Sequence, residues 1–74
     1  MQLLQDFPVH TFVRIVKVTG DDTLMRKLEE IGISIDSEVV ILKNTPQTPL
    51  LVKIGNRRVA ISCTHTLRIY GTSV

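Results

Sequence analysis

Three side chains of this sequence are soft or borderline metal ligands: His10, Cys63 and His65. Cys63 and His65 are separated by one residue, so in an extended strand they would lie on the same face. They lack the paired spacings of a closed zinc site. Ferrous iron would favour carboxylate ligands. These would have to come from other parts of the chain, where the candidates are Asp21, Asp22 and Asp36. We therefore expect no cofactor and interpret Cys63 as a small buried hydrophobe and His65 as a surface turn residue. Weak ferrous iron binding at Cys63 and His65 is the alternative.

Catalytic patterns are missing from the sequence. Nucleophilic catalysis needs a base beside a thiol or hydroxyl, and neither Cys63 nor the serines at 34, 37 and 62 lie in a local His-Asp pattern. Gly20 precedes two aspartates, which would repel phosphate, and the chain contains neither a P-loop nor a Gly-x-Gly-x-x-Gly run. We expect a protein that is not an enzyme.

The charge pattern, the hydrophobic stretches and the cysteine content argue against a nucleic-acid-binding, membrane-spanning or secreted protein. The net charge is only +2, and the basic residues are scattered along the chain. This distribution is too diffuse for a nucleic-acid binding surface. Stacking of nucleic-acid bases would need exposed aromatic side chains. Of the three aromatic residues, we interpret Phe7 and Phe12 as core or edge packing, so that only Tyr70 remains as a candidate. The longest stretches without a charge, 44–52 and 59–67, are too short for a membrane span. A lone cysteine and the lack of a basic, apolar leader favour the cytoplasm.

One helix is predicted, between two turn signals. Leu24, Leu28 and Ile31 have the spacing of one helix face. Residues 21–23 can cap its start, and Gly32 suits the left-handed position that ends a helix in a Schellman motif. The helix follows a predicted strand over residues 12–18, which is rich in β-branched side chains.

The second half of the sequence predicts three more strands and a closing one. Residues 38–43 and 50–54 are separated by a proline-containing loop, and Gly55-Asn56 forms a two-residue hairpin turn. If 54 pairs with 57, then 52 pairs with 59 and 50 with 61, and one face of the hairpin is apolar. Residues 64–66 are expected to turn, and 67–70 to form the last strand.

These elements predict a mostly β fold. Val, Ile and Thr together supply 25 of the 74 residues, and such side chains pack well on pleated sheets. About five short strands around so small a core are best buried in a partly closed barrel. We expect a single domain over residues 1–74, with a core from about 9 to 71: a small SH3-like barrel with one short α-helix after the first strand.

Four segments of the sequence resemble the FeoA family of bacterial ferrous iron uptake: LEEIGI at 28–33, SEV at 37–39, PLLV at 49–52 and GNRRVAI at 55–61. The resemblance extends over residues 9–71. The family usually has glycine where Asp36 stands and another near Val9 or His10, so those turns are expected to differ.

The resemblance implies an SH3-like barrel that acts, without catalysis, with the membrane transporter FeoB, whose cytosolic portion carries a GTPase domain. It implies a cytoplasmic protein held at the inner face of the inner membrane through this partner. FeoA-like domains also occur in metal-dependent repressors, so a metal-binding regulatory domain stays an alternative, as does a small barrel that binds nucleic acid.

Four side chains are candidates for the contact with a partner protein: Met25, Leu51, Arg57 and Arg58. Met25 borders the helix stripe, and its flexible thioether suits an adaptable contact. Leu51 lies on the mixed face of the predicted hairpin without an obvious internal partner. The two arginines, at the hairpin tip, could meet acidic groups. Weak self-association through an exposed edge strand, 38–43 or 67–70, is also considered.

Overall fold

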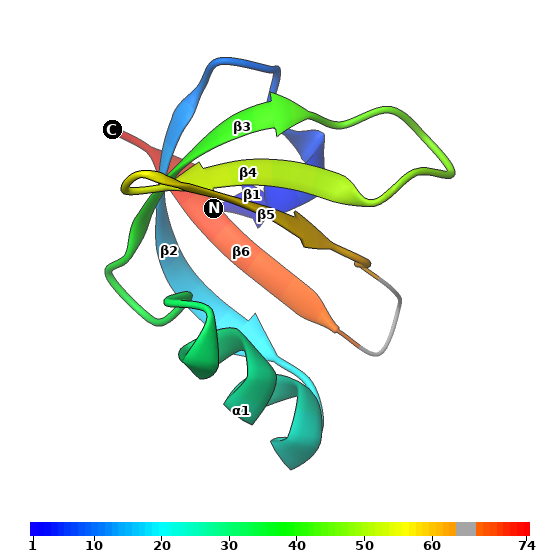
Figure 1. The fold of residues 1–74 in the computed structure, drawn as a ribbon. Helices are drawn as coiled ribbons and strands as arrows, with labels where there is room; N and C mark the ends of the chain where they lie inside the picture. Colours follow the sequence, from blue (N-terminus) through cyan, green and yellow to red (C-terminus); the bar gives the residue numbers. More distant parts are fainter. Residues whose placement is uncertain (64–66) are drawn as a thin grey trace.

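The computed structural model describes residues 1–63 and 67–74, which form one antiparallel sheet with one α-helix (Figure 1). The elements in chain order are β1 (Gln2–Leu3), the 3₁₀ helix η1 (Leu4–Asp6), β2 (Phe12–Thr19), α1 (Asp22–Glu30), β3 (Glu38–Lys43), β4 (Leu50–Ile54), β5 (Arg57–Ile61) and β6 (Arg68–Ser73). The predicted mostly β fold with a single short α-helix is therefore confirmed. The described residues form six strands rather than about five, and α1 follows the second strand because the two-residue β1 precedes it.

The N-terminal segment belongs to the core. β1 pairs with β6, so that Gln2 lies opposite Gly71, and η1 buries Leu4 completely. Phe7 is also buried, and the Asn44 side chain donates a hydrogen bond to its carbonyl oxygen. The expected core from about residue 9 was thus too short at this end. A strand of two residues has no periodicity by which a sequence pattern could identify it.

The ends of α1 have the predicted capping interactions. The Asp21 carboxylate accepts a hydrogen bond from the Leu24 backbone N–H at 2.8 Å. At the other end the Gly32 N–H donates to the Glu29 carbonyl at 3.1 Å and the Ile33 N–H to the Leu28 carbonyl at 2.8 Å, and the φ of Gly32 is 93°. These bonds are the Schellman motif that Gly32 predicts. They fix the helix so that its apolar stripe packs against the core.

The hairpin of β4 and β5 has the predicted register. Ile54 lies opposite Arg57, Val52 opposite Val59 and Leu50 opposite Ile61. Gly55 has a φ of 59° while Asn56 keeps a negative φ, the pattern of a type II′ turn. The apolar face of the hairpin faces the core and its mixed face is turned to solvent.

The sheet order corrects the expectation about edge strands. The order is β1-β6-β2-β3-β4-β5, so β3 and β6 are both internal and pair on both sides. Neither strand is an edge of the sheet, and the edges of the described sheet are β1 and β5. β6 also extends to Ser73, beyond the predicted strand 67–70. The turn predicted at 64–66 lies outside the described residues.

Two residues adopt a backbone conformation that favours glycine, at or near the positions where the FeoA family usually has glycine. Asp36 has a φ of 73° and His10 a φ of 69°, both in the left-handed region. Asp and His occur there more often than most residues. The left-handed conformation that favours glycine is thus present at both positions.

The core is wholly apolar among the described residues. Its buried side chains come from every strand except β1 and from η1, α1 and the connections: Leu4, Phe7, Val13, Ile15, Leu28, Ile33, Val39, Ile41, Leu50, Val52, Ile61, Leu67 and Ile69. The sheet curls around them, with α1 packed on one end (Figure 1). No helix in the described part of the chain is long and apolar enough to cross a membrane.

Candidate partner-binding surface

The convex side of the sheet has an apolar centre with a basic border. Strand register aligns Phe12 of β2 with Val40 of β3, Val40 with Lys53 of β4, and Lys53 with Arg58 of β5. Because side chains alternate along a strand, the buried Val13, Val39 and Val52 point into the core while these four point out. The outer sheet face is our name for this row together with its neighbours on the same side: Phe12, Val40, Leu42, Leu51, Lys53 and Arg58.

Phe12 is the most unusual residue of the outer sheet face, since 60% of it is exposed. Val40, Leu42 and Leu51 are half-buried beside it. A hollow of about 540 Å³ lies here, lined by Phe12, Glu38, Val39, Val40, Leu42, Lys53 and Gly55. A contiguous exposed apolar patch with polar residues at its rim is typical of a protein–protein contact. An aromatic side chain at the centre of such a patch could serve as the anchor of that contact.

The basic border of this face has no partner within the described structure. Lys53 and Arg58 lie directly opposite each other across β4 and β5, an arrangement that like charges make unfavourable. Neither donates a side-chain hydrogen bond to another described residue. A carboxylate supplied by a partner would relieve this repulsion and could accept hydrogen bonds from both Lys53 and Arg58.

The structure does not bring the four predicted contact residues together. Leu51 and Arg58 lie on the outer sheet face. Met25 is half-buried on α1, beside a separate hollow of about 330 Å³ that includes Ile33 and Ile35. Arg57 donates from Nη2 to the Ile31 carbonyl at 2.8 Å, and so ties the hairpin to the C-terminal end of α1.

The sequence interpretation missed other members of this surface. Phe7 is buried as expected, but Phe12 is not core or edge packing: its position before the buried Val13 turns it outward. Alternation along β2 would have indicated this, had the buried set been known. Lys53 could have been recognised only together with the register that places it beside Arg58.

Arg57 is therefore expected to stabilise the fold rather than to bind a partner. Replacing it by Gln removes a cationic donor from the carbonyl end of a helix, where positive charge is favourable. The free energy of unfolding should fall by about 0.5–1.5 kcal/mol, the range of one exposed hydrogen bond. Urea denaturation measures this. The same change at Arg58, which has no such bond, should leave stability nearly unchanged; equal losses would contradict the assignment.

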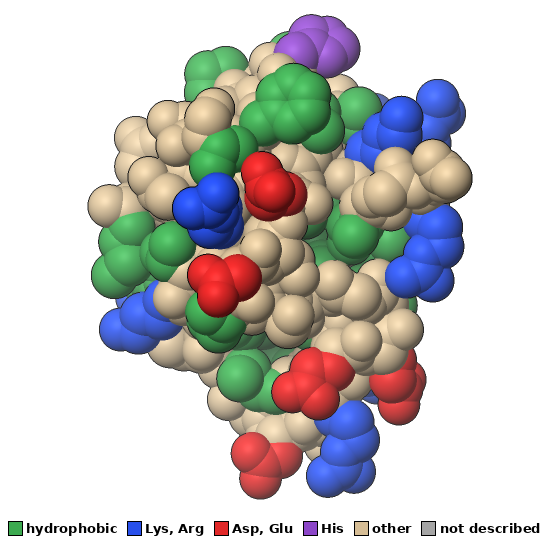
Figure 2. Space-filling view, turned by 90° about the vertical axis from the view of Figure 1, so that its left-hand side faces the viewer, with side chains coloured by type: hydrophobic (Ala, Val, Ile, Leu, Met, Phe, Trp, Pro, Cys, Tyr) green, Lys and Arg blue, Asp and Glu red, His purple; other side chains and the backbone are tan. Residues whose placement is uncertain are grey.

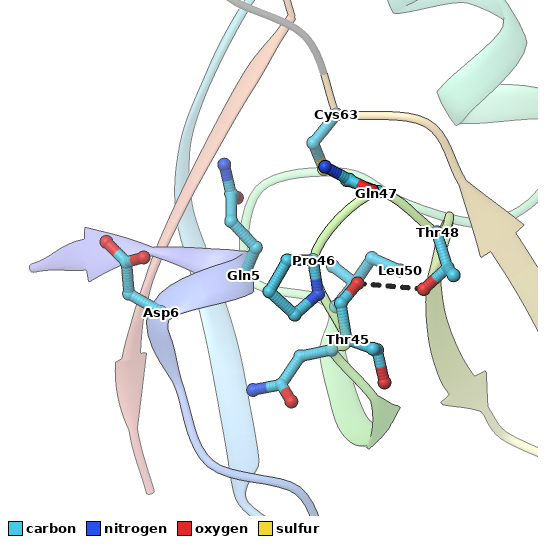
Figure 3. A pocket seen from close by; sticks show the side chains of 9 residues that line it. Gln5, Asp6, Thr45, Pro46, Gln47, Thr48, Leu50 and Cys63 are labelled. Atoms are coloured by element: carbon cyan, nitrogen blue, oxygen red, sulfur yellow. Dashed lines mark hydrogen bonds between the residues drawn. The ribbon is translucent and has the colours of Figure 1, made fainter.

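A third hollow, of about 310 Å³, is lined in part by the only cysteine of the sequence (Figure 3). It lies between η1 and the loop before β4, where Asp6 and Cys63 occupy different sides, so they do not converge on one point. The described residues contain no group of three His, Cys, Asp or Glu side chains that could hold a metal ion. His10 is exposed on another part of the molecule, and His65 lies outside the described residues.

Burial raises the pKa of the Cys63 thiol. The unfolded chain therefore loses this proton first as the pH increases, and the contribution of Cys63 to stability is lost as the pH rises through the folded-state value. We expect iodoacetamide to alkylate Cys63 at pH 8 more slowly than it alkylates free cysteine, because less thiolate is present. Mass spectrometry over time measures the rate. Alkylation as fast as that of free cysteine would show that the thiol is not shielded in this way.

Charged side chains of both signs are mixed on the face that Figure 2 shows, the end of the molecule where the β4–β5 turn projects. Basic side chains lie along the right edge, at the left and at the bottom, with acidic ones in the centre and below, and hydrophobic ones are visible between them. Of the three aromatic residues only Phe12 is exposed; Tyr70 is half-buried, with the Lys17 ammonium 5.7 Å from its ring centre. Nucleic-acid binding would use a basic stripe together with exposed aromatic side chains.

Comparisons with known proteins agree with this geometry. The family model of the FeoA domain matches residues 2–70. The crystal structure of Stenotrophomonas maltophilia FeoA in complex with zinc superposes with a TM-score of 0.78 at 27% identity, covering 97% of this chain and 91% of that one. That protein is described as a procaryotic SH3 domain protein and a possible bacterial ferrous iron transport activating factor. The SH3-like fold expected from the sequence is thereby confirmed.

A second solved structure is also similar. The solution structure of iron(II) transport protein A from Clostridium thermocellum has a TM-score of 0.73 and 26% identity over 81% of this chain. The chain spans only 38% of that protein. No curated protein sequence matches.

Proposed function

Because the chain belongs to the FeoA family, we propose that it is a non-enzymatic accessory protein of ferrous iron transport that binds a FeoB-type transporter and modulates its activity. The family match and the names of the two structural neighbours support the pathway. In this proposal residues 1–74 act as one domain in the cytoplasm, held at the inner face of the membrane by the transporter. The cytosolic GTPase domain of the transporter supplies the contact.

The single observation that carries this proposal is the outer sheet face with its exposed Phe12. The free energy falls when a partner covers a phenylalanine that a small domain exposes beside half-buried aliphatic side chains, because apolar surface is removed from water. The role proposed for this surface is therefore binding. The chain would then change transport by preferring one conformation of the transporter, and a preference of ~1–3 kcal/mol is enough for an allosteric effect.

Replacing Phe12 by Ser should weaken binding to the cytosolic GTPase domain of the transporter by about tenfold or more, as removal of an anchoring aromatic does. The side chain is already exposed, so the fold should be retained. Titration calorimetry with the purified domain measures the dissociation constant, and circular dichroism checks the fold.

The matched control is Ile35→Ser. Ile35 is 52% exposed and lies beside the hollow that contains Met25, away from the row of the outer sheet face. We expect this variant to bind like the unmodified chain. A loss with Ile35→Ser and none with Phe12→Ser would move the contact to the Met25 hollow, and unchanged affinity in both variants would remove both surfaces from the interface.

A further inference from the structure

We propose that the free edge of β5 is a separate binding site for an extended, acidic segment of a partner protein, which adds to the sheet as a further strand. This inference goes beyond the proposed function and does not depend on which protein supplies the segment. It concerns the backbone of Arg58 and Ala60 and the groove between β5 and α1. The Phe12 contact uses neither these backbone groups nor this groove, although the side chains of Lys53 and Arg58 border both surfaces.

The register of the hairpin shows which backbone groups of β5 point away from β4. Ile54 and Arg57 flank a two-residue turn, so this pair exchanges both of its hydrogen bonds. Bonding then alternates along β5, and the N–H and C=O groups of Arg58 and Ala60 point away from β4. β5 ends the sheet order, and no backbone hydrogen bond from a described residue reaches either of them. Both residues are exposed, so an incoming strand could reach these groups.

A groove runs beside this edge. A hollow of about 300 Å³ lies between β5 and α1, lined by Leu24, Lys27, Leu28, Ile31, Ala60, Ile61, Ser62 and Leu67. A strand paired with β5 would direct every second side chain into this hollow. Leu24 and Ile31 are only half-buried there, so apolar side chains at those positions would cover them.

The charges around the edge of β5 determine which side chains suit the alternate positions of the incoming segment, those that do not enter the hollow. Its remaining side chains would lie on the outer side of the sheet, next to Arg58 and the facing Lys53. The groove itself contains Lys27 and no Asp or Glu. Carboxylates would therefore find cations on both sides of the added strand. A second copy of this chain would instead present Arg57 and Arg58 along its own β5 and offers no counter-charge there, so we assign the site to an acidic partner segment.

The experiment uses a capped peptide of about eight residues with alternating glutamate and valine, titrated into the full ¹⁵N-labelled chain. We expect saturable shifts of the Arg58 and Ala60 amides and slower hydrogen exchange at both, because they become hydrogen-bonded donors. A peptide with lysine in place of glutamate should bind about tenfold more weakly or worse, since it meets only like charges.

A pair of variants tests the backbone contact. Ala60→Pro removes the outward N–H at a position where an edge strand tolerates proline, and should lose about tenfold or more in affinity. Ala60→Thr keeps the N–H but adds side-chain atoms at the groove, so it should lose clearly less affinity than Ala60→Pro. If the Arg58 and Ala60 amides do not respond to the glutamate peptide, or if the lysine peptide binds equally well, the proposal is wrong. The peptide comparison uses the unmodified chain, so it decides even where Ala60→Pro fails to fold.

Discussion

Replacing Leu4 by Ala should lower the free energy of unfolding by ~2–5 kcal/mol, as large-to-small changes do at fully buried positions. Leu4 has no exposed surface, although it is only the fourth residue of the sequence. Its side chain belongs to the buried core cluster, and alanine would leave a cavity there. A small domain has a total stability near the low end of ~5–15 kcal/mol, so this loss should populate the unfolded state. Urea denaturation followed by circular dichroism measures it.

The neighbouring Leu3 provides the control for this prediction. It is half-buried in β1, so Leu3→Ala removes less apolar contact and should cost clearly less than Leu4→Ala. Equal stabilities of the Leu4→Ala variant and the unmodified chain would show that η1 does not contribute to the core.

The second large effect is expected at Gly71, where β6 passes close to β2. A Cβ atom at this position would lie 2.3 Å from Cγ1 of Val13 and 2.9 Å from the carbonyl oxygen of Arg14. Neither neighbour can yield cheaply, since Val13 is a stiff β-branched side chain in the core and the oxygen belongs to the backbone of β2. Gly71→Ala should therefore destabilise the chain by about 3 kcal/mol, the upper part of the usual range for overpacking. Thermal unfolding provides the measurement.

Gly55 serves as the comparison, because a Cβ atom there would meet nothing within 4 Å. Gly55→Ala costs only the left-handed backbone conformation, about 1–2 kcal/mol. We expect the Gly71 variant to be the less stable of the two. The reverse order would mean that the strands separate easily at Gly71.

The locally encoded parts of this fold were the predictable ones. The ends of α1 follow from Asp21 and Gly32, and the β4–β5 register follows from Gly55-Asn56, because the groups involved are only a few residues apart. The position of β1 depends on its pairing with the opposite end of the chain, and no local pattern in two residues indicates that. The sheet order, which makes β3 and β6 internal, is likewise decided by long-range pairing.

The candidate surface was predictable to the same extent. Leu51 and Arg58 could be assigned to the outward face of the hairpin because that register was known. Phe12 belongs to a strand whose neighbours were not known, so its exposure could not be derived. Arg57 was placed correctly at the hairpin tip, but its bond to Ile31 depends on how α1 packs beside β5.

The most direct test of the proposed function is an amide-resolved NMR titration of this chain with the cytosolic GTPase domain of its FeoB-type transporter, in the GDP state and with a GTP analogue. We predict saturable shifts centred on Phe12, Val40 and Leu51 of the outer sheet face. A difference between the two nucleotide states would show that the chain senses the GTPase cycle. No shifts in either state, or shifts confined to α1 around Met25, would contradict the account.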